Sequence, residues 1–155
     1  TPHFLDWLEE PLRTDSSATQ WQQIKSKTKI PLAAGENLMG VASFDGAIAS
    51  KSFGVLQPDI AKWGGISGCW PVIQKIREEG IRFCPHYLGA GVGLMASAHV
   101  LAAAGGDGML EVDANDNQLR SLLAPPLKQV LDGYITLDET PGIGVTPDLN
   151  VLGGL

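Results

Sequence analysis

Apolar residues along this chain fall into short runs that alternate with longer amphipathic segments. The short runs resemble strands, and the segments between them carry apolar residues three or four positions apart, as amphipathic helices do. Strands are predicted at residues 4–9, 31–35, 54–57, 81–84 and 109–112. Helices are predicted at residues 18–27, 43–52, 67–80, 94–104 and 118–123. Regular alternation of this kind is typical of a parallel sheet covered by helices, an α/β fold.

Helix-boundary residues support this division. Ser16 and Ser43 are suited to cap the first two helices. In the third, Pro71 suits the first turn and Gly80 the C-terminal end. After Asp113 the alternation stops. Residues 134–139 (YITLDE) form either a strand or an extended arm, and the Pro- and Gly-rich tail indicates an irregular surface segment.

Length and composition favour a single domain over residues 1–155, with strand–helix repeats at 4–113 and a C-terminal arm at 125–155. The net charge is −6 and no basic stripe is present, which argues against nucleic acid or an anionic membrane as a partner. No apolar stretch is suited to span a bilayer, so a cytoplasmic protein is expected. Cys69 and Cys84 are expected to be reduced core thiols.

Each predicted strand ends near one ionisable residue, and successive ones are 23 to 27 residues apart. Because the carboxyl ends of parallel strands lie at one end of a sheet, these side chains should converge where such folds place their active sites. The five residues are Glu9, Glu36, Asp59, His86 and Glu111.

Carboxylates on neighbouring strand ends suggest a hard divalent cation. Mg²⁺ prefers oxygen ligands, and Glu9 and Glu36 would supply two of them. The alternative is that both are ordinary solvated acids. Side-chain alternation places Glu9 and its neighbour Glu10 on opposite sides, without deciding which of them faces the site.

An aspartate and a histidine end the next two strands. Asp59 beside His86 would fix the tautomer of the imidazole and make it a better base near neutral pH. His3 and His99 are interpreted as core or surface histidines without a functional role. Glu111 is either a loop acid or, if kept protonated, a hydrogen-bond donor to developing charge.

The ordered motifs WLEEPL, PLAAGEN, QPDIAKWGGISG, CPHY and LEVD resemble the C-terminal barrel of the enolase superfamily, mandelate racemase subgroup. The resemblance covers residues 4–148 and implies part of a TIM-type (β/α) barrel, with about five parallel strands and outer helices. It implies that Glu9 and Glu36 bind Mg²⁺ and that Asp59 and His86 form a catalytic dyad. Glu111 would be the electrophilic partner, and Lys62 would have a supporting electrostatic role or pair structurally with an acid.

The sequence also departs from the family pattern. The family has a third metal carboxylate on the strand before WLEEPL and a lysine base one strand earlier, and neither is present here. The resemblance also implies an N-terminal capping domain, which residues 1–155 are not expected to contain. The chain is therefore expected to need the N-terminal portion of the same enzyme and to be inactive alone. The resemblance further implies a homo-oligomer.

The chemistry implied by the resemblance is Mg²⁺-dependent abstraction of a proton α to a carboxylate, through an enediolate. Dehydration of an acid sugar by a carbon–oxygen lyase is the first hypothesis. The alternatives are a racemase or epimerase of a 2-hydroxy acid, an inactive fragment, and a binding module without catalysis.

Overall fold

The computed structural model describes residues 4–124 and 130–150. Its sheet has four parallel strands in the order β1-β2-β3-β4, which is also their order along the chain. Leu8 pairs with Leu32, Ala33 with Val55 and Leu56 with Phe83, so neighbouring strands are in direct register. The strands are β1 (Leu8–Glu9), β2 (Leu32–Ala34), β3 (Val55–Leu56) and β4 (Arg82–Phe83).

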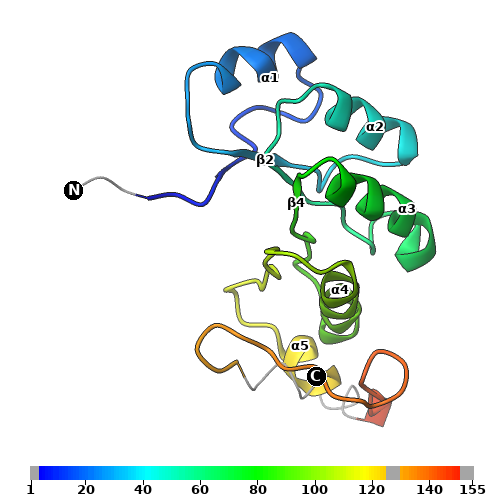
Figure 1. Ribbon diagram of the computed structural model, residues 1–155. Helices are drawn as coiled ribbons and strands as arrows, with labels where there is room; N and C mark the ends of the chain where they lie inside the picture. Colours follow the sequence, from blue (N-terminus) through cyan, green and yellow to red (C-terminus); the bar gives the residue numbers. More distant parts are fainter. Residues whose placement is uncertain (1–3, 125–129, 151–155) are drawn as a thin grey trace.

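A helix follows each strand, and α1, α2 and α3 each return the chain to the start of the next strand. Figure 1 shows α1, α2, α3 and α4 succeeding one another around the outside of the sheet, as expected for part of a (β/α) barrel. The short α5 packs beside α4. The helices are α1 (Ala18–Lys25), α2 (Val41–Ala49), α3 (Gly65–Glu78), α4 (Gly91–Ala104) and α5 (Gln118–Leu123).

The two faces of the sheet have different roles. Leu32, Leu56 and Phe83 point outward and are almost fully buried beneath the helices. The main core lies there, where α2 contributes Phe44 and α3 contributes residues such as Ile73. Burial of such side chains contributes about 1.5–3 kcal/mol each, so this layer holds the strand ends in place.

The inner face carries a smaller apolar cluster of Ala33, Val55 and Cys84, with Trp7 packed against it. Because side chains alternate along a strand, the residues two positions beyond this cluster also point inward, at the carboxyl ends of the strands. The polar residues of interest start there.

Several predicted boundaries differ from the structure. Ser17, and not Ser16, caps α1, and its side chain and that of Gln20 form a reciprocal capping box. Helix α2 begins at Val41 after Gly40, ahead of the predicted Ser43 cap. Helix α4 begins at Gly91, three residues before the predicted start.

The predicted fifth strand at 109–112 is wrong, and the sheet of the described residues has four strands. The physical reason is local, because the Met109 amide donates to Cys84 Sγ (3.3 Å) and not to a backbone carbonyl of β4. The segment therefore runs beside β4 without joining its ladder. Residues 134–139 form no strand, and only the isolated Leu131–Tyr134 bridge touches this segment. Of the predicted arm at 125–155, residues 125–129 and 151–155 lie outside the described part.

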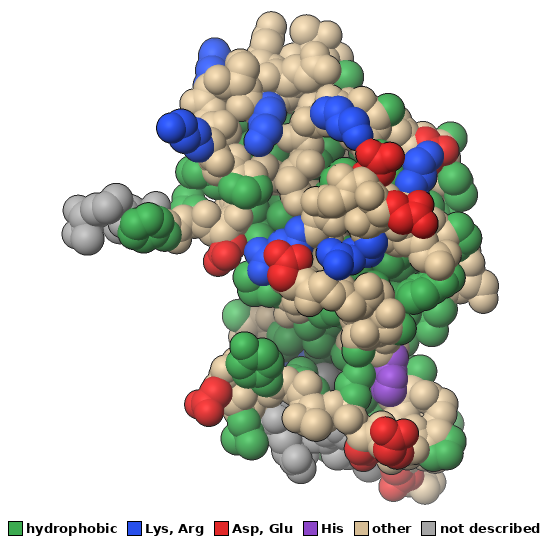
Figure 2. Space-filling model, viewed as in Figure 1, with side chains coloured by type: hydrophobic (Ala, Val, Ile, Leu, Met, Phe, Trp, Pro, Cys, Tyr) green, Lys and Arg blue, Asp and Glu red, His purple; other side chains and the backbone are tan. Residues whose placement is uncertain are grey.

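Charged side chains on the helical layer are of both signs, as Figure 2 shows. The Lys75–Asp45 ion pair (2.7 Å) joins α3 to α2, and the Lys51–Glu79 pair (2.6 Å) joins the residues that follow these two helices. Exposed pairs of this type contribute little to stability. No helix in the described ranges is long and apolar enough to cross a membrane.

Both cysteines are free and buried. Burial raises the pKa of the Cys69 thiol to about 11, and burial also raises the pKa of Cys84. Because the thiolate is the reactive form, we expect both thiols to react with Ellman's reagent at pH 8 only after unfolding in urea. Rapid release of one or two equivalents of chromophore from the native protein would contradict this arrangement.

Candidate active site

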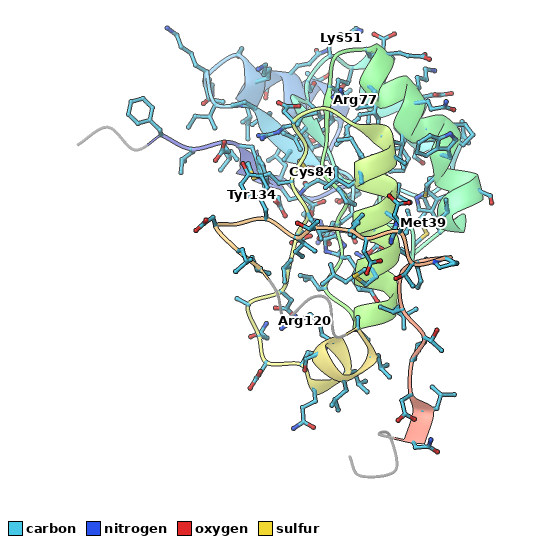
Figure 3. The ribbon with its side chains drawn as sticks, turned by 60° about the horizontal axis from the view of Figure 1, so that its bottom comes forward. Met39, Lys51, Arg77, Cys84, Arg120 and Tyr134 are labelled. Carbon is cyan, nitrogen blue, oxygen red and sulfur yellow. The ribbon has the colours of Figure 1, made fainter. Side chains whose placement is uncertain are left out.

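Polar side chains from separate strands gather at the carboxyl end of the sheet. In Figure 3, Lys51, two residues beyond α2, and Arg77, in the last turn of α3, lie at one end of the sheet and its helices. Met39, from the loop after β2, lies toward the opposite end, with Cys84 between. That opposite end is where the β-to-α loops begin, and it carries the predicted site.

Asp59 and His86 form a buried pair. Their exposed fractions are 3% and 4%, and His86 Nδ1 lies 2.8 Å from Asp59 Oδ2. The other carboxylate oxygen of Asp59 accepts hydrogen bonds from the Ala61 and Lys62 amides at 2.7 and 3.2 Å. The carboxylate is thus held by the backbone that leads into α3, and it orients the ring so that Nε2 faces the site.

Glu36 faces the other nitrogen of the same ring. Its Oε2 lies 2.8 Å from His86 Nε2, while Oε1 lies 3.5 Å from Lys62 Nζ and accepts a 2.8 Å hydrogen bond from Asn37. Both ring nitrogens of His86 therefore face a carboxylate, Asp59 at Nδ1 and Glu36 at Nε2.

Glu9 reaches across β2 to β3. Its Oε2 accepts hydrogen bonds from Gln57 Nε2 and Trp7 Nε1, each 2.9 Å long. The side chain can cross because the residues between are small, Ala33 on the inner face of β2 and Gly35 just after that strand. Glu9 thus points to the same side as Trp7, as alternation predicts.

The twin glutamate Glu10 has a different environment. Its backbone is left-handed, with φ +36°, a rare conformation for a residue other than glycine. Its carboxylate accepts a 3.3 Å hydrogen bond from Asn37, whose amide group also holds Glu36, and a 3.4 Å bond from Thr14. Glu10 therefore lies beside the site and is joined to it through Asn37.

Glu111 comes from the segment that lacks strand pairing. Its Oε2 accepts a 3.2 Å hydrogen bond from the Tyr87 amide and lies 3.9 Å from His86 Nε2. Burial raises the pKa of the Glu111 carboxyl, and the nearby Glu9 and Glu36 carboxylates raise it further, against the opposing effects of His86 and the Tyr87 amide. Glu111 is therefore protonated more readily than an ordinary glutamic acid, and its protonated form could donate a hydrogen bond.

All six predicted site residues thus lie on one rim. Glu36, Asp59, His86, Glu111 and Lys62 are joined by direct contacts, and Glu9 stands apart from them on Gln57 and Trp7.

Sequence reasoning assigned no role to three residues that hold the rim, Gln57, Asn37 and the Tyr87 amide. Gln57 was detectable in principle, because it lies two positions before Asp59 and so shares its face. The contacts of Asn37 and Tyr87 depend on loop conformation, which carries no periodic signal.

Comparison with known proteins decides the family. The family model described as enolase C-terminal domain-like matches residues 1–151. The chain belongs to this family. A mandelate racemase/muconate lactonizing enzyme from Bordetella bronchiseptica RB50 has a solved structure that is 57% identical, with a TM-score of 0.93, over 97% of this chain and 42% of that one.

Two curated relatives carry activity names. D-galactarolactone cycloisomerase from Agrobacterium fabrum is 29% identical over 91% of this chain, and D-galactonate dehydratase from Verminephrobacter eiseniae is 28% identical over 90%. The chain spans 39% and 38% of the lengths of these two proteins. The enolase-like fold and the resemblance to the mandelate racemase group are thereby confirmed.

Enolase superfamily members are generally Mg²⁺-dependent, so the donor set can be tested against that ion. In kind the residues fit, because Glu9 and Glu36 present carboxylate oxygens at neighbouring strand ends. In number they are few: within residues 4–124 and 130–150, no group of three or more His, Cys, Asp or Glu side chains is arranged to hold a metal. Glu9 and Glu36 would therefore be two ligands of a larger set.

Proposed function

We propose that this chain carries the acid–base half of an active site that dehydrates a sugar acid. The observation that supports it most is the buried pair of Asp59 and His86, whose ring presents Nε2 to Glu36 and Glu111 at the open end of the sheet. Relatives named for galactonate and arabinonate dehydration, at 25–28% identity, indicate the substrate class.

Both proton transfers of the dehydration are assigned to the same atom, Nε2 of His86. His86 Nε2 takes the α-proton of the substrate, Asp59 stabilises the imidazolium that forms, and the same proton then passes to the departing β-hydroxyl, which leaves as water. The enol that remains rearranges to a 2-keto-3-deoxy acid. Glu111, whose pKa is raised by burial, donates from its protonated form a hydrogen bond to the carboxylate oxygen on which charge develops.

Glu9 and Glu36 would hold Mg²⁺, which when bound stabilises negative charge on the substrate carboxylate. Lys62 lies 3.5 Å from Glu36 and adds positive charge to the same region. Together, Lys62 and a bound cation would offset the carboxylates of the rim, which an anionic substrate requires in a chain whose net charge is −6.

Cycloisomerisation is the second candidate, because the 29% identical relative from Agrobacterium fabrum carries that name. Racemisation, the third, would return the proton from His86 to carbon and involve no loss of water.

The test is a panel of aldonic and aldaric acids incubated with the full-length gene product and Mg²⁺ in ²H₂O. We expect a 2-keto-3-deoxy acid, detected as its semicarbazone, from at least one member of the panel. Deuterium entering the α-position without formation of a keto acid would contradict dehydration and support racemisation. Consumption of a sugar-acid lactone with neither result would favour the cycloisomerase.

A further inference from the structure

Gln57 is a buried amide with incomplete hydrogen bonding. It is 3% exposed, its Nε2 donates to Glu9 Oε2 at 2.9 Å, and its Oε1 has no partner among the described residues. A buried acceptor without a donor lowers the free energy of unfolding by about 1–3 kcal/mol. A glutamine at this position is therefore not explained by stability. Its position at the carboxyl end of β3 suggests another reason for it.

The two donors on Glu9 converge on a single oxygen. Gln57 Nε2 and Trp7 Nε1 both bind Oε2, each at 2.9 Å, from different strands. Within the described residues no group donates a hydrogen bond to Oε1 of Glu9. A carboxylate held in this way has one fixed oxygen and one oxygen free to bind a ligand.

We propose that Gln57 is a positioning residue that fixes the free oxygen of Glu9 for a divalent cation, with Trp7 as its partner. This proposal rests on the proposed function, because Glu9 is taken there as a metal ligand. Hydrogen bonds to ligating carboxylates hold them in their binding orientation, and removing such a partner lowers metal affinity about 10–100-fold. The close approach of Gly35 brings β2 beside the Gln57 backbone and so sets the place from which the amide reaches Glu9.

The test variant is Gln57→Met, which keeps the length of the side chain and removes both polar atoms. Binding of Mn²⁺ to the full-length gene product, followed by electron paramagnetic resonance of the free ion, gives an affinity that needs no turnover. We expect the affinity to fall about 10–100-fold. We expect the urea midpoint to stay or rise, because the unpartnered acceptor is removed while Glu9 is exposed and can bond to water.

The matched control is Gln74→Met, the same substitution at an exposed position on α3. We expect wild-type Mn²⁺ affinity from this variant. Trp7→Phe provides a second, independent test, because it removes the other donor to the same oxygen and keeps an aromatic ring in place. We expect its Mn²⁺ affinity to fall as well.

The outcomes separate the two proposals. If the unaltered protein binds Mn²⁺ and the affinity is unchanged in Gln57→Met and Trp7→Phe, the positioning role of Gln57 is overturned. The proposed function is not affected by that result. A lower urea midpoint with unchanged affinity would assign Gln57 to stability and also overturn the positioning role. If the unaltered protein binds no Mn²⁺, the metal site of the proposed function fails, and this inference fails with it.

Discussion

Replacing His86 by asparagine is expected to lower the turnover of the full-length protein by about three orders of magnitude or more. The reason is that Nε2 both accepts and returns the proton, and general acid–base catalysis contributes about 10²–10⁴-fold for each transfer. Asparagine keeps a group able to hydrogen bond to Asp59, which is 97% buried and would otherwise lose its partner. Initial rates of keto-acid formation measure the effect.

Mn²⁺ affinity serves as the second measurement on the same variant. Because His86 is assigned to proton transfer and not to the metal, the affinity should remain. The matched control is His99→Asn on α4, away from the rim, for which we expect a rate within about twofold of the unaltered protein. Loss of metal binding in His86→Asn, or a normal rate, would show that the roles are misassigned.

Replacing Gly35 by alanine is expected to destabilise the protein by about 3 kcal/mol. The backbone of Gly35 has φ +140°, which L side chains rarely adopt, and a Cβ there would lie 2.6 Å from the Gln57 nitrogen. Neither strand can move aside easily, because Ala34 and Leu56 are paired and buried beneath the helices. The urea midpoint, at constant m-value, gives the loss.

Gly46→Ala is the control for this substitution. Gly46 lies inside α2, and a Cβ there meets nothing within 4 Å, so alanine should stabilise the helix by about 1 kcal/mol. A Gly35→Ala variant as stable as the unaltered protein would mean that β2 and β3 approach each other less closely than described.

The order of strands and helices could be predicted from the sequence because burial imposes a period. Leu32 and Leu56 are apolar because helices cover them, and the same constraint makes α3 amphipathic. The prediction was wrong at 109–112, where the residues look like a strand but the Met109 amide bonds to a cysteine sulfur instead of to β4. Local pattern cannot report which acceptor a backbone amide finds.

The sequence predicted which residues form the candidate site better than it predicted the contacts between them. Periodicity placed Asp59 and His86 on adjacent strand ends. In the structure, Asp59 Oδ2 lies 2.8 Å from His86 Nδ1. Periodicity could not show that Glu36 contacts the far nitrogen of the same ring, or that Asn37 joins Glu36 to Glu10. Those contacts are set by the loop conformation after β2 and by the positive φ of Glu10.

The most direct test of the central claim is a crystal structure of the full-length gene product with Mn²⁺ and a sugar acid, with the ion located by anomalous scattering. The account predicts one manganese peak bonded to a carboxylate oxygen of Glu9 and of Glu36, with His86 Nε2 facing the α-carbon of the ligand. A peak elsewhere, or a ligand whose α-carbon lies away from His86, would contradict it.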